Sequence, residues 1–236
     1  MSVPASPAPD PALLAVLQFA DGLFPAGGFA HSFGLETYTQ DGVVRDAAGL
    51  EAFVRAQLCA AAGPADAVAV ALAVRAAAAA DAAAWLELDA RLEAMKTVPE
   101  LRAASRQMGR QTLRVATALG DDRVLAALAA AVAEGRAPGH HAVAFGAALG
   151  RQGAAPETAA TAFLYSTAAL LVGAGLRLLP VGQVEGQRLL AGLRPLVAAL
   201  AAAAARAGLD DLWSFAPGLE LAGVRHATLE RRLFRS

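Results

Sequence analysis

Apolar residues along this chain recur every three or four positions, and strict alternation of apolar and polar residues is almost absent. A period near 3.6 is typical of an amphipathic helix, whereas a period of two is typical of a strand. Asp10, Asp46 and Asp81 each stand just before such a segment, where a short acceptor side chain favours a helix N-cap. After Asp81, Trp85 and Leu88 fall on one helical face. The pattern therefore predicts a chain built of helices.

Glycine and proline divide this pattern into segments of helical length. Gly63-Pro64 is expected to end one helix before the next begins, because proline has no N–H group and disfavours a helix interior. Thr97 is followed three residues later by Glu100, the spacing of a capping box, which predicts a helix start at that point. The turns are short, and no internal repeat is present. We expect one all-α domain of about ten helices packed around a central apolar helix.

The most apolar segment lies between Glu157 and Arg177, which bracket nineteen uncharged residues. That length is close to the roughly 20 residues that cross a bilayer. The segment also contains Thr158, Tyr165 and other polar residues, and no cluster of positive charge flanks it. These features favour a central helix buried on all sides by other helices. We therefore expect no membrane span.

Composition and charge narrow the function classes. Hydrophobic residues make up 56% of the chain, charged residues make up 17%, and the net charge is −1. A chain so close to neutral has no large field to attract nucleic acid or an anionic membrane. Cys59 is the single cysteine, which excludes an internal disulfide and fits a reducing compartment. The N-terminus shows no basic region followed by a long apolar core, so we expect no secretory signal.

The most chemically mixed stretch is DGLFPAGGFAHSFGLE at residues 21–36, called the signature segment below. Its glycines do not belong to a G-x-x-x-x-G-K-[ST] motif, which excludes a P-loop, and no serine of the chain lies in G-x-S-x-G. Neighbouring helical residues such as His31 and Ser32 point about 100° apart and do not suit a base–nucleophile pair. A tight turn explains the glycines, but it leaves His31, Ser32 and Glu36 unexplained as a polar set.

Histidines are the candidate metal ligands, and their spacing is unfavourable. His140 and His141 are adjacent, while His31 and His226 lie far away in the sequence. No H-x-x-x-H, C-x-x-C or H-E-x-x-H motif occurs, so a closed structural zinc site is disfavoured. Transient coordination of a borderline metal by imidazole stays open. We expect His140 and His141 to begin a helix within a solvated loop.

The C-terminal region is basic and carries the apolar doublet Leu233-Phe234 between arginines. Arginine beside aromatic residues is a composition favoured in protein interfaces. RNA binding is the alternative, but the region is short and the rest of the chain has no second basic patch. We therefore divide the chain into a disordered segment at 1–9, the all-α domain at 10–224 and a docking tail for a protein partner at 225–236. The basic residues of this tail are Arg225, His226, Arg231, Arg232 and Arg235.

Three segments in the same order resemble the urease accessory protein family UreF. The signature segment matches the family pattern D-x-x-x-P-x-G-G-[FY]-x-H-S-x-G-L-E from Asp21 to Glu36. Residues 177–183, beginning R-L-L-P, are similar to a second family segment that follows an apolar helix. The chain ends R-L-F-R-S, as the family does. The likeness therefore extends over residues 21–236.

The resemblance implies a cytoplasmic, all-α, dimer-forming protein without a cofactor, a resident metal or enzymatic activity. It implies an adaptor that binds the accessory protein UreD (also called UreH) and recruits the GTPase UreG, so that nickel enters apo-urease. The polar set would then form a recognition or metal-passage surface on the dimer. The alternative is a helical metallochaperone that holds nickel through His31, His140 or His141. The expected partner-binding residues are His31, Ser32, Glu36, Arg225, Arg232, Leu233, Phe234, Arg235 and Ser236.

Overall fold

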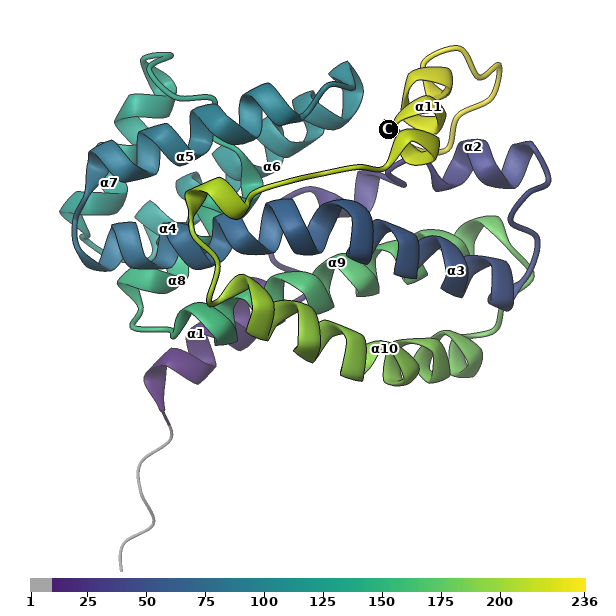
Figure 1. The fold of residues 1–236 in the computed structure, drawn as a ribbon, viewed down its shortest axis with the longest axis horizontal. Coiled ribbons are helices and arrows are strands. Elements are labelled where there is room, and N and C mark those ends of the chain that lie inside the picture. Colours follow the sequence, from purple (N-terminus) through teal and green to yellow (C-terminus); the bar gives the residue numbers. More distant parts are fainter. Residues whose placement is uncertain (1–9) are drawn as a thin grey trace, which may run out of the picture.

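The computed structural model describes residues 10–236, and all regular structure within that range is helical (Figure 1). The predicted all-α class is confirmed, whereas the disorder expected for residues 1–9 lies outside the described residues. Three short elements, η1 Gly28–Ala30, η2 Leu58–Ala67 and η3 Leu209–Asp211, join or interrupt the α-helices. The α-helices are α1 Pro11–Ala20, α2 Leu35–Gln40, α3 Ala47–Gln57, α4 Val68–Ala78, α5 Ala82–Met95, α6 Pro99–Ala118, α7 Arg123–Ala133, α8 His141–Arg151, α9 Pro156–Leu178, α10 Gln183–Ala204 and α11 Pro217–His226.

The aspartate N-caps predicted from the sequence are present. The carboxylates of Asp10, Asp46 and Asp81 accept backbone N–H groups at the starts of α1, α3 and α5. The capping box expected at Thr97 is wrong, because α6 begins at Pro99 and its N-cap is Val98, with no side-chain cap. Proline at the first helical position has the required φ and no N–H to satisfy, so this helix begins without a capping side chain.

The break expected at Gly63-Pro64 is also wrong. One helix runs from Ala47 to Ala78, and in Figure 1 it crosses the width of the molecule. Its middle part, Leu58–Ala67, is wound as a π-helix that contains Pro64. In α geometry the proline ring would clash with the carbonyl of the preceding turn, and the wider π turn is a known way to accommodate such an insertion. Counted as one, this helix brings the described residues to the expected ten helices.

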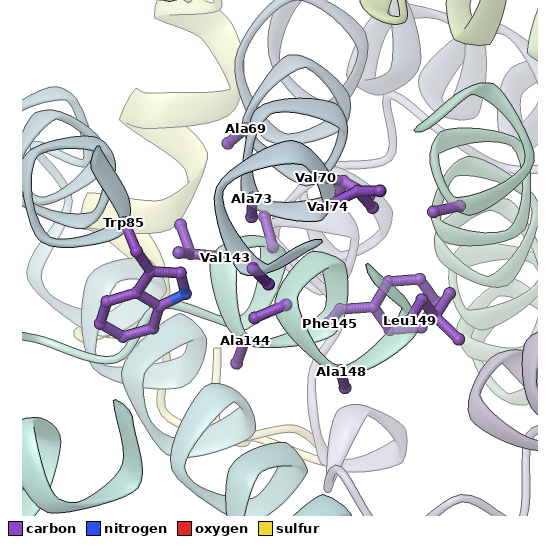
Figure 2. Packing of buried hydrophobic residues seen from close by; sticks show 14 of the residues in the cluster. Ala69, Val70, Ala73, Val74, Trp85, Val143, Ala144, Phe145, Ala148 and Leu149 are labelled. Carbon is purple, nitrogen blue, oxygen red and sulfur yellow. The ribbon is translucent and has the colours of Figure 1, made fainter. Parts of the chain in front are cut away.

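Helices α4 and α8 pack at unusually short range in one half of the molecule (Figure 2). The contact is made by alanine and valine of α4 and by glycine, alanine and valine of α8. A Cβ atom added at Gly146 would lie 2.4 Å from the Val70 carbonyl oxygen, and one at Gly150 would lie 2.6 Å from that of Val74. Backbone approach at this distance requires glycine. Small residues at this contact therefore allow the two helices to approach closely.

Helix α9 is the central apolar helix, because it packs against α10, α4, α8, α1 and the π segment. It is not buried on all sides, since Tyr165 is 42% exposed. Helices 47–78 and 156–178 are long and apolar enough to cross a membrane, a test that core helices of soluble proteins also pass. Their most apolar windows are 61% and 56% buried inside the fold. We therefore interpret both as core helices.

Candidate functional site

The C-terminal residues that follow α11 return to the signature segment. We call residues 227–236 the tail; its end lies close to α11 in Figure 1. The Arg235 amide donates to the carbonyl of Ala30 at 2.8 Å. The amides of Ser32 and Phe33 both donate to the Ser236 carbonyl oxygen, at 2.6 and 3.1 Å. These backbone bonds connect the end of the tail to the signature segment.

Side chains add to this contact. The Ser32 hydroxyl donates to the Ser236 carbonyl oxygen at 3.0 Å, and His31 Nδ1 lies 2.8 Å from the Ser236 hydroxyl. Phe33 has φ +52° and Gly34 has φ +90°, so two successive residues are left-handed. Such a turn directs neighbouring N–H groups toward one oxygen. A left-handed phenylalanine is strained by about 1–3 kcal/mol, which the tail contacts help to offset.

The carboxylate of Glu36 holds the middle of the tail. It accepts the amides of Leu233 at 2.6 Å and Phe234 at 3.1 Å. It also accepts a hydrogen bond from His226 Nε2 at 3.0 Å. Glu36 is only 2% exposed, so these three donors replace the water that a buried carboxylate would otherwise require. The aligned donors make Glu36 the main anchor of the tail.

His226 extends the network from Glu36 to α6. Its Nδ1 lies 2.8 Å from Glu100 Oε2, and Arg232 donates to the other oxygen of Glu100 at 2.9 Å. The imidazole is fully buried, whereas the Glu100 side chain is 26% exposed. Two carboxylates, one imidazole and one guanidinium are thus gathered where the tail meets α2, α6 and α11.

Arg177, the first residue of the segment 177–183 that resembles the family, also contacts the tail and the signature segment. Its guanidinium carbon lies 3.8 Å from the centre of the Phe29 ring and 4.2 Å from that of Phe234. It also donates to the Phe29 carbonyl at 3.0 Å. A guanidinium between two aromatic faces forms cation–π contacts. All three segments that carried the resemblance therefore meet at one site.

The structure corrects the expected exposure of the polar set. His31, Ser32 and Glu36 are 3%, 0% and 2% exposed, because the tail covers them, so they do not form a surface here. Burial also lowers the pKa of His31, which favours its neutral form. Their role in partner binding stays a prediction.

The basic and apolar residues expected at the C-terminal end, in α11 and the tail, divide into two groups. Phe234 and Ser236 are buried, while Leu233 remains 63% exposed. Arg225 is exposed and forms a bidentate ion pair with Asp41, at 2.6 and 2.9 Å. The doublet Leu233-Phe234 therefore points one side chain into the protein and the other into solvent. Sequence reasoning identified this segment as a docking segment, and in this structure it docks on its own chain.

Comparison with known proteins gives the family. A family model described as UreF matches residues 44–194. The urease accessory protein UreF of Bacillus sp. (strain TB-90) is 33% identical over 228 residues, covering 95% of this chain and 99% of that protein. The proteins of the same description from Arthrobacter sp. (strain FB24) and Rhizobium leguminosarum bv. trifolii (strain WSM2304) are 36% and 37% identical, and each covers 96% of the relative. The chain belongs to the UreF family.

The remaining histidines of this UreF family member lie in a different cluster. His140 is fully buried, with Nδ1 3.0 Å from the Ser105 hydroxyl and Nε2 2.9 Å from Glu93 Oε2. Asp89 accepts the amides of Gly139 and His140 at 2.6 and 2.8 Å. The solvated loop expected here is therefore wrong. The sequence did not reveal these partners because they come from α5 and α6, more than thirty positions away.

This cluster fixes the start of α8 on the neighbouring helices. Burial lowers the pKa of His140 to about 4, so its imidazole is neutral at pH 7. A carboxylate only accepts, so Nε2 carries the proton toward Glu93 and Nδ1 accepts from Ser105. His141, beside it, pairs with the Thr112 hydroxyl at 3.2 Å. Among residues 10–236 no group of three or more His, Cys, Asp or Glu side chains is arranged to hold a metal ion, and His31 belongs to the tail cluster.

A cavity of about 350 Å³ lies beside the signature segment. Its walls are mainly apolar, with Phe24, Phe29 and Leu170 among them. Lys96 and Asp66, which are paired at 2.8 Å, also line it. The signature segment therefore has two sides in this UreF fold, one covered by the tail and one facing the cavity.

Proposed function

We propose that this chain is an adaptor that joins the accessory protein UreD (UreH) to the GTPase UreG and so promotes nickel insertion into apo-urease. In this proposal it works in the cytoplasm as a homodimer, and it carries no catalytic centre of its own. The observation that supports it is membership of the UreF family over nearly the whole chain. The relatives are described as urease accessory proteins.

The surface around the tail fits a partner-binding role. Large apolar side chains are exposed from the segment before α11 to the end of the tail. Exposed apolar side chains are typical of protein interaction sites, and these lie close together in the sequence. The tail itself is held by hydrogen bonds and one aromatic anchor, which a partner surface could replace. The exposed apolar residues are Trp213, Phe215, Leu221, Val224 and Leu233.

Co-purification tests the adaptor directly. The tagged chain is expressed with UreD/UreH and UreG, and full length is compared with a form that ends at Arg231. We expect the full-length chain to capture both partners and the shortened chain to lose UreD/UreH while keeping its helical circular dichroism. Capture of UreD/UreH by the shortened chain would contradict the assigned role of the tail.

A point substitution separates partner contact from tail docking. Leu233→Asp changes an exposed side chain and leaves the backbone amide that Glu36 accepts. We expect it to weaken capture of UreD/UreH. Leu119→Asp is the matched control, because Leu119 is similarly exposed at the end of α6. If the full-length chain captures neither partner but binds nickel stoichiometrically in equilibrium dialysis, the metallochaperone alternative replaces the adaptor.

A further inference from the structure

The hydrogen bonds of His226 require a second ring proton. Its Nδ1 faces Glu100 Oε2 at 2.8 Å and its Nε2 faces Glu36 Oε2 at 3.0 Å. An ionised carboxylate accepts hydrogen bonds and donates none, and a neutral imidazole has one N–H. Both contacts are therefore favourable only when His226 is the doubly protonated imidazolium.

Loss of this proton would act on the tail through Glu36. A neutral His226 would direct one nitrogen lone pair at a carboxylate oxygen about 3 Å away, which is repulsive. His226 and Glu36 are both buried, so water does not screen the contact. Glu36 is also the acceptor for the amides of Leu233 and Phe234, so any displacement of its carboxylate weakens the tail.

The charges of the four groups in this cluster sum to zero only when His226 is protonated. Glu36 and Glu100 supply two negative charges, and His226 and Arg232 supply two positive charges. Removing the histidine proton leaves one uncompensated negative charge in a largely buried site, which is costly. The other ionisable groups around the tail are His31 on the signature segment, Arg235 on the tail, Arg177 on α9, and the pair Arg225–Asp41 joining α11 to α2.

We propose that His226 is a proton-operated latch, which holds the tail on the signature segment when protonated and releases residues 227–236 when it loses its proton. Release uncovers His31, Ser32 and Glu36 and frees Phe234. The docked state binds one more proton than the released state, so docking strengthens as pH falls and weakens as pH rises. The latch is a property of the isolated chain and does not depend on the proposed partners.

Spin-label mobility at position 233 tests the latch. The label is attached through Leu233→Cys, an exposed position, in a Cys59→Ala background that removes the native thiol. We expect the label to be immobilised at pH 5.5 and mobile at pH 8.5, with one transition between them. An equally immobile label at both pH values would overturn the proposal.

Two substitutions assign the transition to His226. In Glu100→Gln the amide donates to Nδ1, so a neutral His226 satisfies both neighbours, and the tail should stay docked at pH 8.5. In His226→Gln the pH dependence should disappear. His31→Gln is the matched control, since His31 also contacts the tail, and it should keep the wild-type transition. A wild-type transition in Glu100→Gln or His226→Gln, or its loss in His31→Gln, would refute the assignment to His226.

Discussion

Phe234→Ala should release the tail from the signature segment. The Phe234 ring is 4% exposed and lies under the Arg177 guanidinium at 4.2 Å. Burying a phenylalanine contributes about 1.5–3 kcal/mol, and a cation–π contact contributes about 0.5–2 kcal/mol. The docking free energy should therefore fall by about 3 kcal/mol, which is a factor on the order of 100 in the docking equilibrium.

Hydrogen exchange at two amides measures this change. The amides of Ser32 and Phe33 donate to the Ser236 carbonyl, so they should exchange when the tail leaves. We expect their protection to fall on the order of 100-fold in Phe234→Ala. Leu233→Ala, an exposed neighbour, should change it less than about twofold. Unchanged protection in Phe234→Ala would refute the view that this ring anchors the tail.

Three further predictions concern the stability of the fold. Gly146→Ala should lower the melting temperature, because its Cβ would lie 2.4 Å from the Val70 carbonyl oxygen; an unchanged value would contradict the close packing. Gly192→Ala, at an exposed α10 position with nothing within 4 Å, should instead stabilise by about 0.5–1 kcal/mol in urea unfolding. The pKa of His140 is lowered by burial from 6.5 to about 4, so its contribution to stability is present above pH 6.5 and is lost as pH falls toward 4. Because of this group, the free energy of unfolding should be about 2 kcal/mol smaller at pH 5 than at pH 7. A pKa near 6.5 for the His140 imidazole in an NMR titration would contradict this prediction.

Local features of the sequence predicted local structure well. Asp10, Asp46 and Asp81 cap helices as expected, because a cap depends on residues within one turn. Pro64 was misjudged because its neighbours allow a π turn, and that depends on packing against other helices. Thr97 has the right spacing for a cap, but Pro99 sets the helix start.

The arrangement of the candidate site was not predicted from the sequence, and the partner-binding role of its residues stays a prediction. Glu36 and Leu233 are separated by 197 positions, and nothing in either segment shows that one accepts the amide of the other. Polar residues in a glycine-rich turn usually indicate a surface, so the burial of His31 and Ser32 under the tail could not be inferred. The likeness to the UreF family identified these segments as important, and only the fold showed that they meet.

The nickel content of urease tests the central claim most directly. Urease is expressed with UreD/UreH and UreG, together with the full-length chain, the chain ending at Arg231, or no chain, and the metal in the purified enzyme is measured. The account predicts nickel-loaded urease with the full-length chain and nickel-poor urease in the other two cases. Equal nickel content with and without the chain would contradict the claim that it promotes nickel insertion.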